Sequence, residues 1–148
     1  MGRRTAVSMS MAVAVAAVAA LAAPAAVPTR IDGTFHVRIG ATDLRAASAE
    51  GLLAADDVGT WTVTFAGGRW TLRQSHGAYG NSFDRGTVTL TGPRAVFTLS
   101  SADGFPHHEY LGILRWRATA GSFRFTHPGH ATSDILFVLA ARNWARVR

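Results

Sequence analysis

The chain has 148 residues, of which 48% are hydrophobic and only 16% are charged. This composition excludes a solvated, disordered chain and leaves room for one domain with a single core. All 15 basic residues are arginine, and the formal net charge is +6. Because the chain has no cysteine, disulfides, thiol nucleophiles and cysteine-based zinc sites are excluded.

Residues 1–26 have the layout of a secretory signal peptide. Arg3 and Arg4 form a basic head, an Ala/Val run covers residues 12–23, and small residues follow. Cleavage near Ala25 or Ala26 would leave a single domain of residues 27–148, secreted or associated with the cell envelope, with a charge of +4. An uncleaved anchor is disfavoured because the run is short and rich in alanine. Sec and twin-arginine export both remain open.

The mature chain begins with a strand and a helix. In residues 33–39, Phe35, Val37 and Ile39 alternate with polar residues, which is the period of two of a half-buried strand. Thr42 or Asp43 can then cap a short helix that runs to about residue 55. We predict this helix as the only one in the mature chain.

Residues 59–72 give the clearest hairpin signal. Trp61, Val63 and Phe65 share one face, a turn follows at residues 66–69, and Trp70 begins the next strand.

Five further strands are predicted, each bounded by turn residues: 86–91, 95–100, 111–119, 122–127 and 135–142, the last with an extension towards Arg148. The total is about eight strands, which suits an antiparallel barrel or a sandwich. We predict an all-β fold, an eight-stranded antiparallel meander barrel with one short helix between strands 1 and 2. A barrel is preferred because short hairpins need no crossovers and closure removes exposed edges.

Several short motifs carry a family resemblance. Gly59-Thr60-Trp61 resembles the Gly-x-Trp motif of lipocalins, and Gly68-Arg69-Trp70, Leu114-Arg115-Trp116 and Asn143-Trp144-Ala145-Arg146 complete a pattern similar to that of small exported actinobacterial proteins of lipocalin-like, or calycin-like, barrel type. The resemblance implies a barrel floor closed by Trp61 under Arg146, with Arg142 as the other candidate. A cation–π contact of this kind contributes about 0.5 to 2 kcal/mol and is structural.

An eight-stranded barrel is either filled by its own side chains or holds one small ligand, and both outcomes are open at this point. If the barrel is hollow, its apolar lining would accept a small apolar molecule. The residues expected to line such a site are Phe35, Phe65, Trp70, Phe97, Tyr110, Trp116 and Phe125.

Other chemistries have weaker support. His107, His108 and Glu109, with His127 and His130, contain zinc-ligand types, but neighbouring residues of an extended chain point apart, so we expect no metal and no cofactor. The seven aspartates and two glutamates form no pattern that indicates a hydrolytic triad. The arginines alternate with apolar residues, as on a solvated face, so we expect contact with anionic envelope polymers or lipid heads and no nucleic-acid binding.

The sequence therefore favours a secreted, non-enzymatic, calycin-like barrel that binds a small apolar ligand or acts as an envelope-associated binding module. The alternative is a small barrel enzyme of isomerase or cyclase type on an apolar substrate, with Glu109, Tyr110, His107 or His108 as its acid/base group. The oligomeric state stays open.

Overall fold

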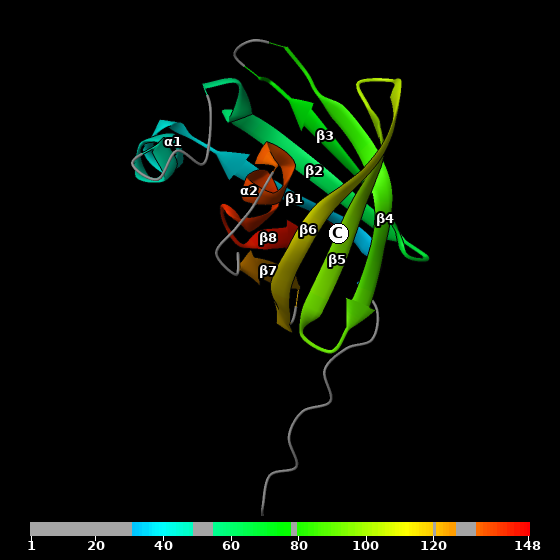
Figure 1. Ribbon diagram of the computed structural model, residues 1–148. Helices are drawn as coiled ribbons and strands as arrows, with labels where there is room; N and C mark the ends of the chain where they lie inside the picture. The colour runs from blue at the N-terminus through cyan, green and yellow to red at the C-terminus, as the bar shows by residue number, and fades with distance from the viewer. Residues whose placement is uncertain (1–30, 49–54, 78–79, 120, 127–132) are drawn as a thin grey trace, which may run out of the picture.

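The computed structural model describes residues 31–48, 55–77, 80–119, 121–126 and 133–148, in which eight strands form one closed barrel (Figure 1). Every strand pairs antiparallel with its neighbours in sequence, and β8 closes the barrel on β1. The predicted fold class is confirmed. The elements are β1 (Gly33–Ile39), α1 (Ala41–Ser48), the 3-10 helix η1 (Ala55–Asp57), β2 (Gly59–Ala66), β3 (Arg69–Ser75), β4 (Phe83–Thr91), β5 (Arg94–Ala102), β6 (Phe105–Thr119), β7 (Ser122–Thr126), α2 (Asp134–Ala140) and β8 (Trp144–Arg146).

The alternation of apolar and polar residues determines which side chains are buried in the core. On β2, Trp61, Val63 and Phe65 are buried, whereas the threonines between them are half-buried. The predicted hairpin is confirmed, with Phe65 opposite Trp70. Gly67 and Gly68 have φ values of 56° and 78°, which is the left-handed geometry that a two-residue hairpin turn requires.

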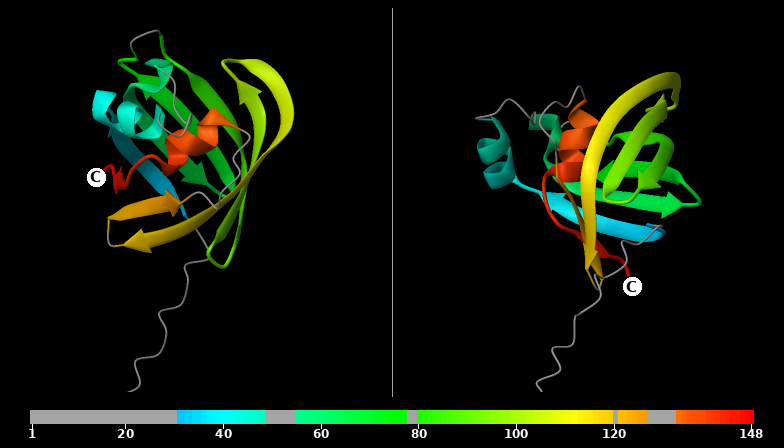
Figure 2. Two further views of the ribbon diagram at one scale, coloured as in Figure 1. Left: turned by 60° about the vertical axis from the view of Figure 1, so that its left-hand side comes forward. Right: turned by 60° about the horizontal axis from the view of Figure 1, so that its bottom comes forward.

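The meander gives the barrel two different ends. The short turns after β2, β4 and β6 lie at one end, which we call the turn end. The connections after β1, β3, β5 and β7 lie at the other, which we call the α2 end, and they include α1, η1 and α2. In both figures of the whole chain α2 lies between α1 and β6 at this end (Figures 1 and 2).

The predicted last strand is wrong. Residues 135–142 were expected to extend along the barrel wall, but α2 covers most of this segment, and the closing strand is the three-residue β8. A short run that is apolar on both faces fits a buried helix as well as a buried strand. Leu136, Val138 and Leu139 are buried, and α2 packs on β6 and β7. The helix between β1 and β2 is therefore not the only helix.

Other boundaries differ by smaller amounts. The β4 strand begins at Phe83 and β6 begins at Phe105, so both start earlier than the alternation predicted. The predicted signal peptide, residues 1–26, and residues 49–54 of the predicted helix lie outside the described residues. In the part of the chain that the structure describes, no helix is long and apolar enough to cross a bilayer.

Aromatic rings fill the turn-end half of the interior. Phe123 lies 4.6 Å from Phe35 and 4.9 Å from Phe125, measured between ring centroids, in edge-to-face geometry. Phe97 lies 5.4 Å from Phe125, and Trp144 stacks on Phe123 at 5.9 Å. Contacts of this kind stabilise the fold beyond simple area burial. The cluster, which we call the aromatic core, comprises Phe35, Phe65, Trp70, Phe97, Phe123, Phe125 and Trp144.

Candidate functional site

The barrel wall has few paired residues where β8 lies between β7 and β1. β8 is paired with only two residues of each neighbour, so β7 and β1 diverge towards the α2 end. A groove of about 530 Å³ lies on the outside of the barrel at this place. We call it the seam groove. Its polar lining consists of His36, Arg38, Asp43, Arg124, Arg142 and Asn143.

Three guanidinium groups reach the seam groove from three different elements. Arg38 lies on the outward face of β1, because it alternates with the buried Val37 and Ile39. Arg124 on β7 donates a hydrogen bond to Asn143 Oδ1 at 3.3 Å. Since Asp43 is the one carboxylate in the lining, the groove has an excess of positive charge.

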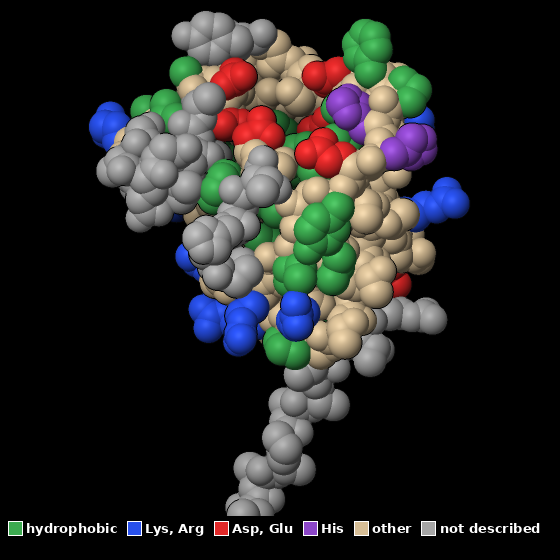
Figure 3. Space-filling view, in the orientation of Figure 1, with side chains coloured by type: hydrophobic (Ala, Val, Ile, Leu, Met, Phe, Trp, Pro, Cys, Tyr) green, Lys and Arg blue, Asp and Glu red, His purple; other side chains and the backbone are tan. Residues whose placement is uncertain are grey.

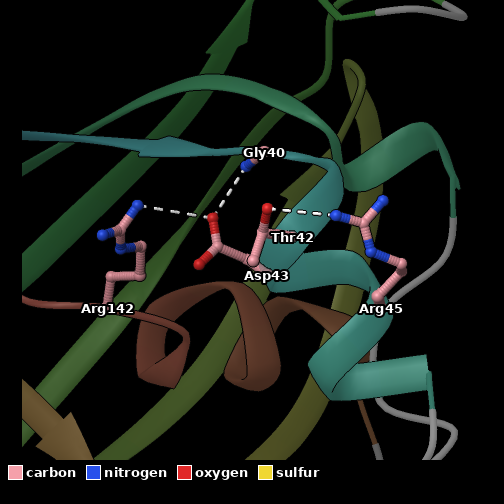
Figure 4. Close-up of polar contacts among 5 residues, drawn as sticks. All are labelled: Gly40, Thr42, Asp43, Arg45 and Arg142. Carbon is pink, nitrogen blue, oxygen red and sulfur yellow. Dashed lines mark hydrogen bonds and ion pairs between the residues drawn. The ribbon is translucent and has the colours of Figure 1, made fainter.

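Asp43 organises one side of the groove, as Figure 4 shows. Its Oδ2 accepts a hydrogen bond from the backbone N–H of Gly40 at 2.8 Å and pairs with Arg142 Nη1 at 3.4 Å. The Arg142 side chain is 56% exposed, so this ion pair contributes little stability and leaves most of the guanidinium accessible. Nearby, Arg45 donates to Thr42 Oγ1 at 3.3 Å.

The α2 end of the barrel holds a second group of polar side chains. Among the described residues, four polar or charged side chains are buried, and all of them lie towards this end: Asp57, Gln74, Asp84 and Ser101. The amide of Gln74 donates to the backbone oxygens of Asp56 and Val58, so it ties η1 to β3.

Asp84 is the carboxyl group at the α2 end whose pKa departs most clearly from its ordinary value. Burial raises the pKa of Asp84 from 3.8 to about 6, and the negative charges of Asp103 and Asp134 contribute in the same direction. The Oγ of Ser101, on the adjacent strand, is buried and has no hydrogen-bond partner among the residues that the structure describes. Within the described ranges, no three His, Asp or Glu side chains lie close enough to hold a metal ion.

The predicted floor pair is not the pair that the structure contains. The guanidinium of Arg146 lies 4.8 Å from the ring centroid of Phe35, and it donates a hydrogen bond to the backbone oxygen of Asp32. Trp61 instead donates from Nε1 to the backbone oxygen of Asp57 at 2.8 Å. The arginine therefore covers an aromatic ring at the turn end, whereas Trp61 anchors η1 at the α2 end.

The predicted lining residues do not all lie in one place. Tyr110 is 58% exposed on β6, so it does not line the interior. His107, His108 and Glu109, the predicted acid/base candidates, are also exposed on β6, and His127 and His130 lie outside the described residues. The remaining predicted residues are buried: Phe35, Phe65, Trp70, Phe97, Trp116 and Phe125.

The sequence analysis predicted neither the seam groove nor the buried polar side chains at the α2 end. Asp84 could have been found by extending the alternation of Gly86 and Val88 back by two residues, because all three are buried. Arg38 and Arg124 are separated by 86 positions in the sequence, so no local pattern brings them together.

Comparison with known proteins identifies no family for this chain. No family model, curated protein sequence or solved structure matches the chain.

Proposed function

We propose that this protein is an exported, non-enzymatic binding module that holds anionic groups of cell-envelope polymers in the seam groove. The observation that carries the proposal is the meeting of Arg38, Arg124 and Arg142 in one groove with a single carboxylate. The planar guanidinium group forms paired hydrogen bonds with phosphate and carboxylate groups, so three of them favour an anionic ligand.

The packed interior supports a role for the outer surface. The turn-end half of the barrel is occupied by the aromatic core, so a ligand there would have to displace rings that already contact one another. We base the proposed export on the predicted signal peptide. We also propose that the barrel is calycin-like, on the basis of the sequence motifs.

A polymer suits the seam groove better than a membrane surface. Proteins that bind at a bilayer surface usually insert exposed apolar side chains. Of the large exposed apolar residues, Phe105 and Tyr110 lie on β6 and Val147 follows β8, and none of the three lines the seam groove. The arginines therefore lack the apolar companions that membrane insertion needs.

The test is co-sedimentation of the protein, purified from the culture medium of its host, with isolated host envelopes. A triple variant, Arg38→Gln, Arg124→Gln and Arg142→Gln, should bind at least tenfold more weakly because it removes the groove cations. A second triple variant, Arg69→Gln, Arg85→Gln and Arg94→Gln, removes the same charge from exposed positions outside the groove and should bind within twofold of the unchanged protein.

Equal losses in the two triple variants would overturn the proposal, because net charge alone would then explain binding. Binding to anionic lipid vesicles but not to delipidated envelopes would replace the polymer with a membrane. Native mass spectrometry of the same material provides a third outcome: a stoichiometric apolar adduct would favour a carrier function over the module.

A further inference from the structure

A second groove lies at the α2 end of the barrel, between the end of β3, the start of β4 and the turn from β5 to β6. We call it the rim groove. Its volume is about 590 Å³, within the range of roughly 300–1,000 Å³ that is typical of small-molecule sites. Its polar lining consists of Arg73, Gln74, Ser75, Asn81, Ser82 and Asp103.

Arg73 supplies positioned donors to the rim groove. Its guanidinium carbon lies over the Phe83 ring, 5.1 Å from the ring centroid. The two residues are cross-strand partners at the last pair of the β3–β4 ladder. In the described ranges, the guanidinium makes no hydrogen bond and no ion pair. A guanidinium that stacks on a ring keeps the N–H groups at its edge for a ligand.

Asp103 supplies an acceptor whose position is fixed by two hydrogen bonds with Phe83. The backbone N–H of Asp103 donates to the Phe83 oxygen, and Asp103 Oδ1 accepts from the Phe83 N–H, both at 2.7 Å. Asp103 and Gly104 have φ values of 47° and 88°, which is the geometry of a two-residue hairpin turn. Asp103 is exposed, and no residue that the structure describes donates to its Oδ2.

Gln74 adds a buried amide to the lining. The residue is only 3% exposed, and its Nε2 donates two hydrogen bonds, to the backbone oxygens of Asp56 and Val58. These bonds use both hydrogens of the amide and fix its orientation. The carbonyl oxygen Oε1 is therefore the part of Gln74 that a ligand in the rim groove can use.

The charges of the rim groove differ from those of the seam groove. Arg73 and Asp103 are its two charged lining residues, so its formal charge is zero, and within the described part of the chain they do not pair with each other. In the space-filling view, Asp and Glu side chains gather at the upper end of the visible face, where the α2 end lies (Figure 3). These charges disfavour an anionic ligand and leave a neutral, polar one.

We infer that the rim groove binds a neutral saccharide, whose adjacent hydroxyl groups bridge Arg73 and Asp103. A hydroxyl group both donates and accepts, so one can accept from the guanidinium while its neighbour donates to the carboxylate. Asn81 and Ser82 offer side chains that also donate and accept. The rim groove shares no lining residue with the seam groove, so this site goes beyond the proposed function.

The test is a titration of the isotope-labelled protein, followed through its backbone amide signals by NMR. The probes are the methyl glycosides of glucose, mannose, galactose and N-acetylglucosamine. The controls are cyclohexanol, which has a ring of the same size with one hydroxyl, and glucuronate, which adds a negative charge. At least one glycoside should bind saturably and at least fivefold more tightly than either control. No saturable binding of any glycoside, or a control that binds as tightly as the best glycoside, would overturn the inference.

Asp103→Asn tests the acceptor. The variant keeps an oxygen that can accept from the Phe83 N–H but removes the charge, and it should weaken glycoside binding at least fivefold. Asp32→Asn is the matched control, because Asp32 Oδ1 accepts from the Gly67 N–H at 3.1 Å at the turn end. It should change binding less than twofold. Equal effects of the two variants would contradict a site at the rim groove.

Arg73→Met tests the donors. The variant keeps an apolar side chain over the ring and removes the guanidinium, so it should weaken glycoside binding at least tenfold. Arg85→Met changes an exposed arginine on β4 that does not line the rim groove, and it should bind within twofold of the unchanged protein. Unchanged binding by Arg73→Met would contradict the bridging role of Arg73.

The same spectra locate the ligand and show whether each variant folds. Signals of the Phe83 and Gln74 amides should move on binding, whereas that of Ala145, beside the seam groove, should not. Shifts confined to other parts of the barrel would place the saccharide elsewhere and overturn the inference. The seam-groove triple variant should bind the glycoside within twofold of the unchanged protein, so failure of one site is distinguishable from failure of the other.

Discussion

At the scale of single residues, Asp84 couples the fold to pH. Its pKa is about 6 in the folded protein and 3.8 in the absence of the fold. The folded state therefore binds the proton more tightly, so this group favours folding fully below about pH 3.8, and the contribution is lost as the pH rises through about 6.

The variant Asp84→Asn tests this linkage. Its free energy of unfolding, relative to that of the unchanged protein, should rise between pH 4 and pH 7 by no more than about 3 kcal/mol, and by less where solvent screens the carboxyl group. Urea unfolding at a series of pH values measures the difference. A difference that is flat over this range would show that Asp84 titrates normally.

Gly86 is a position where only a hydrogen atom fits. A Cβ there would collide with the backbone oxygen of Thr98 and lie 2.9 Å from Trp70 Nε1. The close approach lets the Trp70 indole donate to the backbone oxygens of Thr87 and Thr98, both at 3.1 Å.

We therefore expect Gly86→Ala to lower the free energy of unfolding by about 3 kcal/mol or more, because backbone must move to relieve the collision. Gly40→Ala is the control, since the nearest atom to its added Cβ is a carboxylate oxygen at 3.8 Å. Denaturant unfolding of both variants checks the prediction, and similar losses for the two would contradict it.

At the scale of elements, α2 is part of the core and not a surface addition. Leu136 and Leu139 are fully buried, and the Trp144 indole donates to the Leu139 backbone oxygen at 2.8 Å. This bond joins the end of the helix to the start of β8, so the helix also sets the position of the strand that closes the barrel.

Truncation of α2 side chains should reflect this packing. Leu139→Ala should lower the free energy of unfolding by about 2–5 kcal/mol, the range for a fully buried leucine. Ile135→Ala, at a half-buried position of the same helix, should cost clearly less. Equal effects, measured by chemical denaturation, would mean that α2 does not pack as described.

At the scale of the whole molecule, the aromatic core joins strands from both ends of the sequence. Phe35 on β1 contacts Phe123 on β7, and Phe97 on β5 contacts both Phe125 and Trp70. The barrel has no edge at which one part could unfold alone. Loss of one strand would therefore expose rings that belong to the others.

We accordingly expect a single cooperative unfolding transition. Tryptophan fluorescence and far-ultraviolet circular dichroism should give the same denaturation midpoint. The fluorescence reports on four buried residues, Trp61, Trp70, Trp116 and Trp144. Separate midpoints would show that the α2 end unfolds independently of the aromatic core.

Local patterns in the sequence are sufficient to predict the barrel and most of its strands. Alternation of apolar and polar residues, as in Phe35 to Ile39 and Trp61 to Phe65, is local information, because each strand displays its buried face within a few residues. The glycine turns between strands are local as well. The same reasoning placed most of the aromatic residues inside.

The conformation of residues 134–140 and the contacts between polar groups depend instead on how the whole chain packs. Their apolar run fits a buried helix or a buried strand, and the outcome depends on the opening that the helix covers. Arg38, Arg124 and Arg142 meet only because β8 joins β7 to β1. Asp103 approaches Asp84 through the pairing of β4 with β5, whereas Asp134 approaches it only after α2 packs at this end of the barrel. The contacts made by β8 and α2 depend on closure of the whole sheet, which no short stretch of sequence specifies.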